Sequence, residues 1–156
     1  MDRLPVSLKR GTAMTMNRIS IGAEKLVYVI CASKMIKYDA GKSPIVYIGT
    51  TKKGVERIAQ SAAYRAYDIL YTHGVDALSV RIVTCGPRQH VKTWHKLERA
   101  LLLVFKEEYG EIPMCNTQGK NITETNEFVY FAKDRIRAIL ADLSKSDLAD
   151  GHVVSS

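Results

Sequence analysis

Two tyrosines, one arginine and one glutamate have the side-chain types and the order along this chain that phosphodiester cleavage requires. Tyr28 and Tyr47 each lie at the centre of a short apolar segment, Arg57 follows ten residues after Tyr47, and Glu98 lies within an apolar helical pattern. Cleavage of a phosphodiester needs a base, a cation beside the phosphate and a ligand for a metal ion. A tyrosine, the arginine and the glutamate are one candidate for each role.

The two tyrosines share a face if their segments pair as antiparallel strands. With Ile30 opposite Ile45, Tyr28 lies directly opposite Tyr47. Directly opposed side chains have Cβ atoms about 5 Å apart, so two phenols would flank a single spot on the sheet. The alternative is that both rings pack in a core or at a sheet surface, because tyrosine is a favoured strand residue.

Arg57 lies in the first turns of an expected helix, beside its apolar stripe. Ser61 follows at position i+4, and Tyr64 and Arg65 continue the same polar and aromatic edge. A guanidinium group binds phosphate through two parallel hydrogen bonds, which makes Arg57 a candidate for that contact. The alternative is a solvated surface arginine.

Glu98 is surrounded in its helical pattern by apolar residues at positions i−4, i−1, i+3 and i+4. Its carboxylate is therefore expected in or beside an apolar face, where an unpaired charge is costly. One carboxylate together with a phosphate and waters is a common way to hold magnesium. The alternative is an ion pair with His95, with Arg99 or with an arginine of another element.

The remaining histidines and lysines give weaker indications. His73, His90 and His95 are not spaced as a metal-binding motif, and each is explained equally well as a surface residue. Lys52 and Lys53 follow the second tyrosine segment directly, where they can reach a phosphate. A solvated turn explains the two lysines as well.

Three strands and three helices follow from the apolar periodicity. The strands are expected at 26–32, 45–50 and 78–83, and the helices at 54–71, 90–109 and 124–143. The polar stretch 33–44, which contains Gly41 and Pro44, is expected to be a long hairpin loop. Residues 112–120 are expected to be irregular.

The length of 156 residues fits one domain with a sizeable core. Residues 1–23 are interpreted as an N-terminal tail or covering segment, 24–143 as the folded domain with its C-terminal helix, and 144–156 as a disordered tail. No apolar run is long enough to span a membrane, and the N-terminus lacks the apolar core of a secretory signal.

Charge and cysteine content indicate the partner and the compartment. The formal net charge of +7 and the pI near 9.4 suit a polyanion, and nucleic acid is the commonest one. The three cysteines are scattered and form no CxxC pair, which favours free thiols in an intracellular compartment. The expected location is cytoplasmic, and nucleoid-associated when DNA is bound.

Taken in order, these motifs resemble the GIY-YIG nuclease family over residues 25–120. Val27-Tyr28-Val29 corresponds to the first motif and Tyr47-Ile48-Gly49 to the second. Arg57 matches the helix arginine, Glu98 the metal-binding glutamate and Asn116 the late asparagine. Five elements in order make the match more specific than any single motif.

The resemblance implies an α/β fold, with a small antiparallel sheet of about three strands flanked by helices. It also implies a DNA endonuclease that depends on Mg²⁺ or Mn²⁺. Glu98 would hold the metal ion, Arg57 would grip the phosphate, and Tyr28 would act as the base with Tyr47 orienting it; the opposite division between the tyrosines stays open. The substrate is expected to contact other residues, which are Gly49, Lys52, Lys53, Ser61, Tyr64, His73 and Asn116. A homodimer or a partner protein is left open as the source of specificity.

The chain departs from the family pattern in three places. Leu26-Val27 replaces the glycine before Tyr28, Ser61 occupies the position where a histidine or tyrosine is frequent, and stretch 33–44 lengthens the gap between the tyrosines. The first two departures favour an alternative reading as a catalytically weak or inactive nucleic-acid-binding module. An adaptor for acidic protein surfaces is a third reading.

Overall fold

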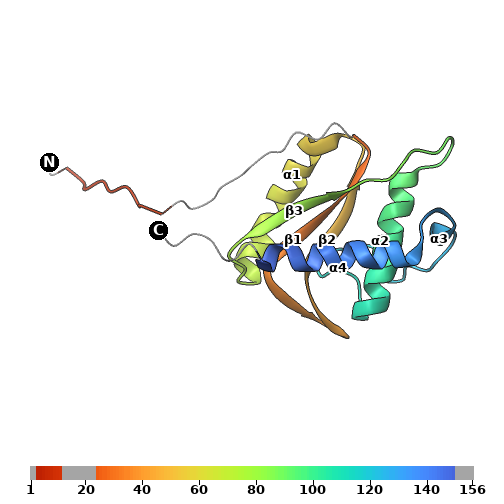
Figure 1. The fold of residues 1–156 in the computed structure, drawn as a ribbon. Helices are drawn as coiled ribbons and strands as arrows, with labels where there is room; N and C mark the ends of the chain where they lie inside the picture. The colour runs from red at the N-terminus through yellow and green to blue at the C-terminus, as the bar shows by residue number, and fades with distance from the viewer. Residues whose placement is uncertain (1–2, 12–23, 150–156) are drawn as a thin grey trace.

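The computed structural model describes residues 3–11 and 24–149 of the chain. Residues 3–11 have no regular secondary structure and are exposed, so this part of the predicted covering segment covers nothing. Residues 12–23 lie outside the described part. The folded part contains a sheet with helices on both faces (Figure 1).

The sheet is antiparallel and has the strand order β2-β1-β3. The central strand β1 (Leu26–Tyr38) pairs on one side with β2 (Gly41–Thr51) and on the other with β3 (Leu78–Val83). These strands confirm the predicted fold class of a small three-stranded antiparallel sheet flanked by helices. The seven residues that open β1 are all buried, which explains their uninterrupted apolar run.

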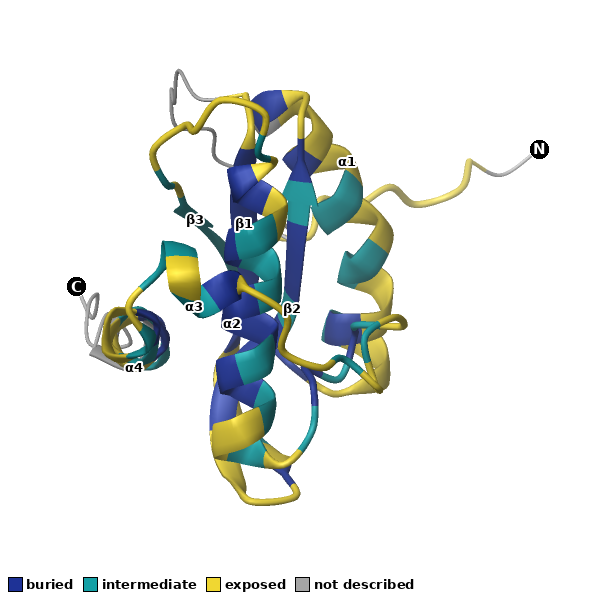
Figure 2. Cartoon of the chain, turned by 90° about the vertical axis from the view of Figure 1, so that its right-hand side faces the viewer, coloured by how far each residue is buried: buried dark blue, intermediate teal, exposed yellow. Residues whose placement is uncertain are grey.

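Two cores enclose the sheet, one on each face. Val27, Val29 and Cys31 of β1 pack against helices α2 (Thr93–Tyr109) and α4 (Lys133–Ala149). Leu26, Tyr28, Ile30 and Ala32 of β1 belong to the core on the opposite face, which includes Ile58 of helix α1 (Gly54–Tyr67). Figure 2 shows the consequence: the parts of β1 and β2 between the helices and one side of α2 are buried, β3 is intermediate, and much of α1 faces solvent.

The predicted pairing of Ile30 with Ile45 is wrong. Ile30 lies opposite Tyr47, and Tyr28 lies opposite Gly49. A bulge causes the difference, because Val46 has no partner and the next pair is Cys31 with Ile45. The bulge also turns Val46 and Tyr47 to the same face of the sheet, toward α1.

The prediction of a long loop at 33–44 is also wrong. Strands β1 and β2 continue through most of this stretch, and only Asp39 and Ala40 connect them. A second irregularity places 32–35 opposite Pro44, which has no N–H with which to continue the ladder. Figure 1 shows the resulting two-stranded arm projecting beyond the helices.

The two middle helices lie close to their predicted positions. Helix α1 begins at Gly54 and continues as the π-helix η1 (Asp68–Thr72), which confirms the helix predicted at 54–71. Helix α2 begins at Thr93 rather than at His90, because residues 88–91 form a bridged turn. Gly110 ends α2 with a φ of 80°, a left-handed conformation that glycine adopts at little cost.

The single helix predicted at 124–143 is two helices in the structure, α3 (Glu127–Tyr130) and α4. Phe131 between them is extended, which interrupts the helical hydrogen bonds. Helix α4 continues to Ala149, so residues 144–149 are helical although a tail was predicted there. Residues 150–156 lie outside the described part.

Among the described residues, no helix is long and apolar enough to cross a membrane. The three cysteines, all among the described residues, form no disulfide with one another: Cys31 and Cys115 are buried, and Cys85 is partly exposed.

Candidate active site

A pocket of about 890 Å³ opens where β2, α1, α2 and the segment 116–122 meet. Tyr47 enters it from β2, Arg65 from α1, and Glu98 from α2. Two of the four predicted catalytic residues, Tyr47 and Glu98, therefore line one pocket although they are far apart in sequence.

Gly49 allows the ring of Tyr47 to reach the ring of Tyr28. The two tyrosines lie on the same face in a diagonal arrangement, and their ring centroids are 5.6 Å apart. A Cβ atom on Gly49 would lie 2.6 Å from the Tyr47 ring, far inside van der Waals contact. The sequence Tyr47-Ile48-Gly49 thus has a physical reason: the residue two positions after the tyrosine must lack a side chain for this ring position.

Tyr28 is held away from the pocket. Only 4% of the residue is exposed, it does not line the pocket, and its hydroxyl shares a hydrogen bond of 2.6 Å with the Ser61 hydroxyl. Burial is the main cause that raises the pKa of Tyr28 to about 12, although the bond to Ser61 lowers it in part. Such a phenol stays protonated at neutral pH, which is unfavourable for the predicted role as a base.

Arg65 is the pocket residue that the sequence analysis missed. Its guanidinium carbon lies 3.7 Å from the centroid of the Tyr47 ring, and its Nη1 donates to the Cys115 carbonyl at 3.3 Å. Ser61 contacts Tyr28 on the sheet, and Arg65 follows Ser61 at i+4 on the same helical face. That spacing was the available signal, but using it required knowing that Ser61 faces the sheet.

Glu98 is a partly desolvated carboxylate in the pocket wall. Its side chain is 23% exposed, and burial raises its pKa to about 7, against a smaller lowering effect of Arg99. Its ion-pair partner among the described residues is His95, at 3.7 Å. The pKa of His95 is lowered by burial and by Lys92 and Lys52, so this partner is mostly uncharged at neutral pH.

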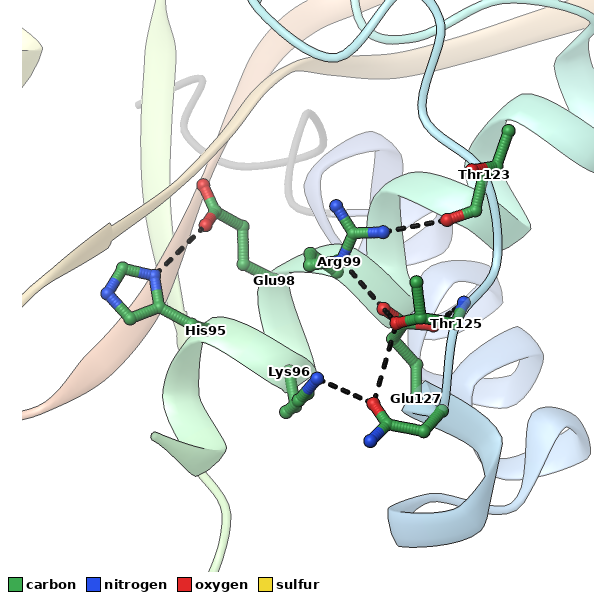
Figure 3. A network of polar contacts seen from close by, with 8 residues as sticks. His95, Lys96, Glu98, Arg99, Thr123, Thr125 and Glu127 are labelled. Atoms are coloured by element: carbon green, nitrogen blue, oxygen red, sulfur yellow. Dashed lines mark hydrogen bonds and ion pairs between the residues drawn. The ribbon is translucent and has the colours of Figure 1, made fainter. Parts of the chain in front are cut away.

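Arg99, adjacent to Glu98, points the other way and is neutralised (Figure 3). Its Nε donates to the fully buried Glu127 carboxylate at 2.6 Å, and its Nη2 donates to the Thr123 carbonyl at 2.7 Å. Burial works against ionisation of Glu127, but hydrogen bonds from Arg99 and Thr125 prevail and lower its pKa to about 2. Arg99 and Glu127 thereby fasten segment 123–127 to α2. The sequence analysis did not identify Glu127, because it lies within a stretch that was predicted to be an ordinary helix.

Asn116 fixes the strand that carries Tyr47. Its Oδ1 accepts from the Ile48 N–H at 3.0 Å, and its Nδ2 donates to the Ile48 carbonyl at 2.8 Å. The N–H of Cys115 donates to the Val46 carbonyl at 2.9 Å, so the backbone on both sides of Tyr47 is held. The predicted site residue Asn116 lines the pocket and also positions its neighbour.

The other predicted site residues do not line this pocket. Arg57 is exposed and donates to Gln60 at 3.1 Å, Tyr64 is 82% exposed, and His73 pairs with Asp68 at 3.9 Å. Lys52 and Lys53 are exposed at the turn before α1, although Lys52 is close enough to influence His95. The structure therefore brings Tyr47, Glu98 and Asn116 of the predicted site together in one pocket, and it leaves Arg57 outside that pocket.

Among the residues that the structure describes, no three histidine, cysteine, aspartate or glutamate side chains converge as a metal-binding group. Comparisons with models of protein families, with curated proteins and with solved structures found no match for this chain. The GIY-YIG resemblance stays a prediction.

Proposed function

We propose that this protein is a metal-dependent endonuclease that hydrolyses DNA phosphodiester bonds in the pocket between α1 and α2. The observation that supports it most is the convergence of a desolvated carboxylate, Glu98, a phenol, Tyr47, and a guanidinium, Arg65, in one pocket. These are the groups that bind a metal, move a proton and neutralise a phosphate. The separation of the three residues in sequence argues against a chance local cluster.

Glu98 fits a single-carboxylate site for Mg²⁺ or Mn²⁺. Burial disfavours its charge, and its one ion pair among the described residues is with a histidine whose pKa is lowered. A divalent cation would relieve that cost, and phosphate oxygens and waters would complete its coordination. The bound metal would polarise the scissile phosphate and stabilise the charge that develops on it.

Tyr47 is the better candidate than Tyr28 for the base. Tyr47 lines the pocket, whereas the Tyr28 hydroxyl is occupied by Ser61 and its pKa is raised to about 12. The Arg65 guanidinium carbon lies 3.7 Å from the Tyr47 ring centroid, so a cationic group stacks directly on this phenol. Tyr47 would accept a proton from the attacking water, and the ring of Tyr28 would hold the Tyr47 ring in place by packing against it.

The net charge of +7 suits DNA as the partner, with affinity that falls as salt rises. Lys52 and Lys53, in the exposed turn before α1, would contact the phosphate backbone of the DNA. The proposed location is the cytoplasm, at the nucleoid when DNA is bound. Specificity would come from a homodimer or from a partner protein.

A second candidate function is a nucleic-acid-binding module without catalysis. The bond between Tyr28 and Ser61 and the exposed position of Arg57 favour it, because both remove an expected catalytic group from the pocket. Such a module would keep the affinity for DNA and would lack turnover.

Nicking of supercoiled plasmid separates the two functions. The full-length protein is incubated with plasmid in MgCl₂ or in EDTA, beside Glu98→Ala and the control Glu124→Ala, which removes an exposed carboxylate outside the pocket. A nuclease nicks only with magnesium, loses nicking in Glu98→Ala and keeps it in Glu124→Ala. Equal nicking by all three proteins would refute the assignment of Glu98. No nicking, combined with salt-sensitive binding of plasmid, would favour the binding module.

A further inference from the structure

Three cationic side chains line the pocket, and they differ in what they are free to bind. They are Arg65, Arg99 and Lys120. Arg99 is committed to the Glu127 carboxylate and the Thr123 carbonyl. Lys120 is exposed at the rim, where its backbone carbonyl accepts a hydrogen bond from Lys106 Nζ at 2.6 Å. Arg65 alone of the three comes from α1, whereas Glu98 comes from α2.

The charge of Arg65 is not neutralised within the described part of the chain. No carboxylate lies within ion-pair distance of its guanidinium among the described residues, and the hydrogen bond it makes is to the Cys115 carbonyl. Its Nε is buried and has no hydrogen-bond partner there. The positive charge of Arg65 therefore lacks a counter-charge within the described residues, and an anion bound in the pocket would supply one.

The geometry of the guanidinium fits one class of anion. Nη1 donates one hydrogen to the Cys115 carbonyl and Nε is covered by the protein, which leaves Nη2 and the second N–H of Nη1 without a hydrogen-bond partner among the described residues. Two N–H groups of one guanidinium form a fork that matches two oxygens of a phosphate or a carboxylate. The Tyr47 ring stacks on the guanidinium and restricts its rotation, so less conformational freedom is lost when an anion binds.

We infer that Arg65, rather than Arg57, is the arginine that binds the nucleic-acid phosphate in this pocket. The inference rests on the proposed function for its substrate, a phosphodiester. Arg57 lies two turns earlier on α1, is exposed, and contacts Gln60 outside the pocket. Arg65 stacks on Tyr47 and shares the pocket with Glu98, so a phosphate held by Arg65 would share one pocket with the candidate base and the candidate metal ligand.

Binding without cleavage tests the inference. The probe is a short fluorescein-labelled DNA duplex, titrated in EDTA and followed by fluorescence anisotropy with the unsubstituted protein and four variants. Arg65→Gln removes the charge and the fork, and Arg65→Lys removes only the fork. Arg57→Gln tests the competing assignment, and Arg135→Gln is the matched control because Arg135 is an exposed arginine of α4 outside the pocket. Circular dichroism establishes that each variant is folded.

Arg65→Gln is expected to weaken duplex binding by at least about tenfold, the effect of losing charged hydrogen bonds. Arg65→Lys is expected to weaken it by about threefold, because lysine has no fork. Arg135→Gln should change it by less than about twofold. If Arg65→Gln does not fold, the inference is tested by the loss of duplex affinity in Arg65→Lys alone. Affinity unchanged in Arg65→Lys and Arg65→Gln, or a larger loss in Arg57→Gln than in either, would overturn the inference.

Plasmid nicking in MgCl₂ with the same proteins distinguishes this inference from the proposed function. If Arg65→Gln loses duplex binding and the unsubstituted protein does not nick plasmid, the phosphate site is supported and the nuclease function is rejected. Nicking at the same rate by the unsubstituted protein and by Arg65→Gln retains the nuclease and rejects the role of Arg65.

Discussion

Replacement of Glu98 by glutamine should stabilise the protein at alkaline pH while it removes the proposed metal ligand. Burial raises the pKa of Glu98 from 4.5 to about 7, so the folded state binds its proton more tightly than the unfolded state does. The favourable contribution of the protonated form is present below pH 4.5 and is lost as pH rises through about 7. Glutamine is always neutral and escapes that loss.

The magnitude follows from the pKa shift. Each unit is worth about 1.4 kcal/mol, so the shift corresponds to about 3 kcal/mol at pH 8 and to almost nothing at pH 4. For a domain of this size, about 3 kcal/mol raises the melting temperature by roughly 6–12 °C. Because the side chain is still 23% exposed, these values are upper bounds.

Urea denaturation at pH 4 and pH 8, in EDTA, measures the effect. Glu98→Gln should unfold at a higher urea concentration than the unsubstituted protein at pH 8 and at nearly the same concentration at pH 4. The exposed control Glu124→Gln should change neither midpoint. A Glu98→Gln variant less stable than the unsubstituted protein at pH 8 would show that Glu98 contributes a stabilising ion pair, and the reasoning about its desolvation would be wrong.

Three further outcomes follow from the geometry of the pocket and its wall. Glu127→Gln should lower the free energy of unfolding by about 3 kcal/mol at pH 7. Because the pKa of Glu127 is lowered from 4.5 to about 2, this loss, measured by urea unfolding, should shrink as pH falls through that range. A loss independent of pH would contradict the ion pair with Arg99. Gly49→Ala should displace the Tyr47 ring and lower the nicking rate by at least about tenfold. The free energy of unfolding should fall by less than about 2 kcal/mol, because the ring can rotate away from the new methyl group. A crystal structure of the variant with the ring in its original position would refute this prediction. Tyr47→Phe should abolish single-turnover cleavage, and Tyr28→Phe should slow it by less than about tenfold and cost about 1 kcal/mol for the lost hydroxyl bond; the reverse order would return the role of base to Tyr28.

The sequence predicted the strands and helices where an apolar pattern is strong and continuous. The first residues of β1 are apolar without interruption, and the stripe of α2 follows a helical period, so both elements were found. The arm at 33–44 was missed because β1 continues there through Ser33, Lys34 and Lys37, residues that indicate a loop when only composition is considered. Pairing with the facing strand, which is a tertiary effect, overrides that local preference.

The surroundings of a candidate site residue could be predicted only where they are formed by neighbours on the same helix or strand. Glu98 was recognised from its apolar helical neighbours, and its partial burial bears out that reasoning. Arg65 was missed because its direction follows from Ser61 facing the sheet, a tertiary contact that the pattern of α1 alone does not show. The fully buried Glu127 was missed because Arg99, its partner, is distant in sequence.

The amide of Asn116 has a consequence for how this protein behaves at high concentration. Strand β2 is at the edge of the sheet, where unpaired backbone groups can template association with another chain. The Asn116 side chain occupies both backbone groups of Ile48, and Cys115 occupies the Val46 carbonyl, so this stretch of the edge is already satisfied. Deamidation of Asn116 would place a carboxylate against the Ile48 carbonyl and open the edge, which makes one side-chain amide a guard against self-association through the sheet.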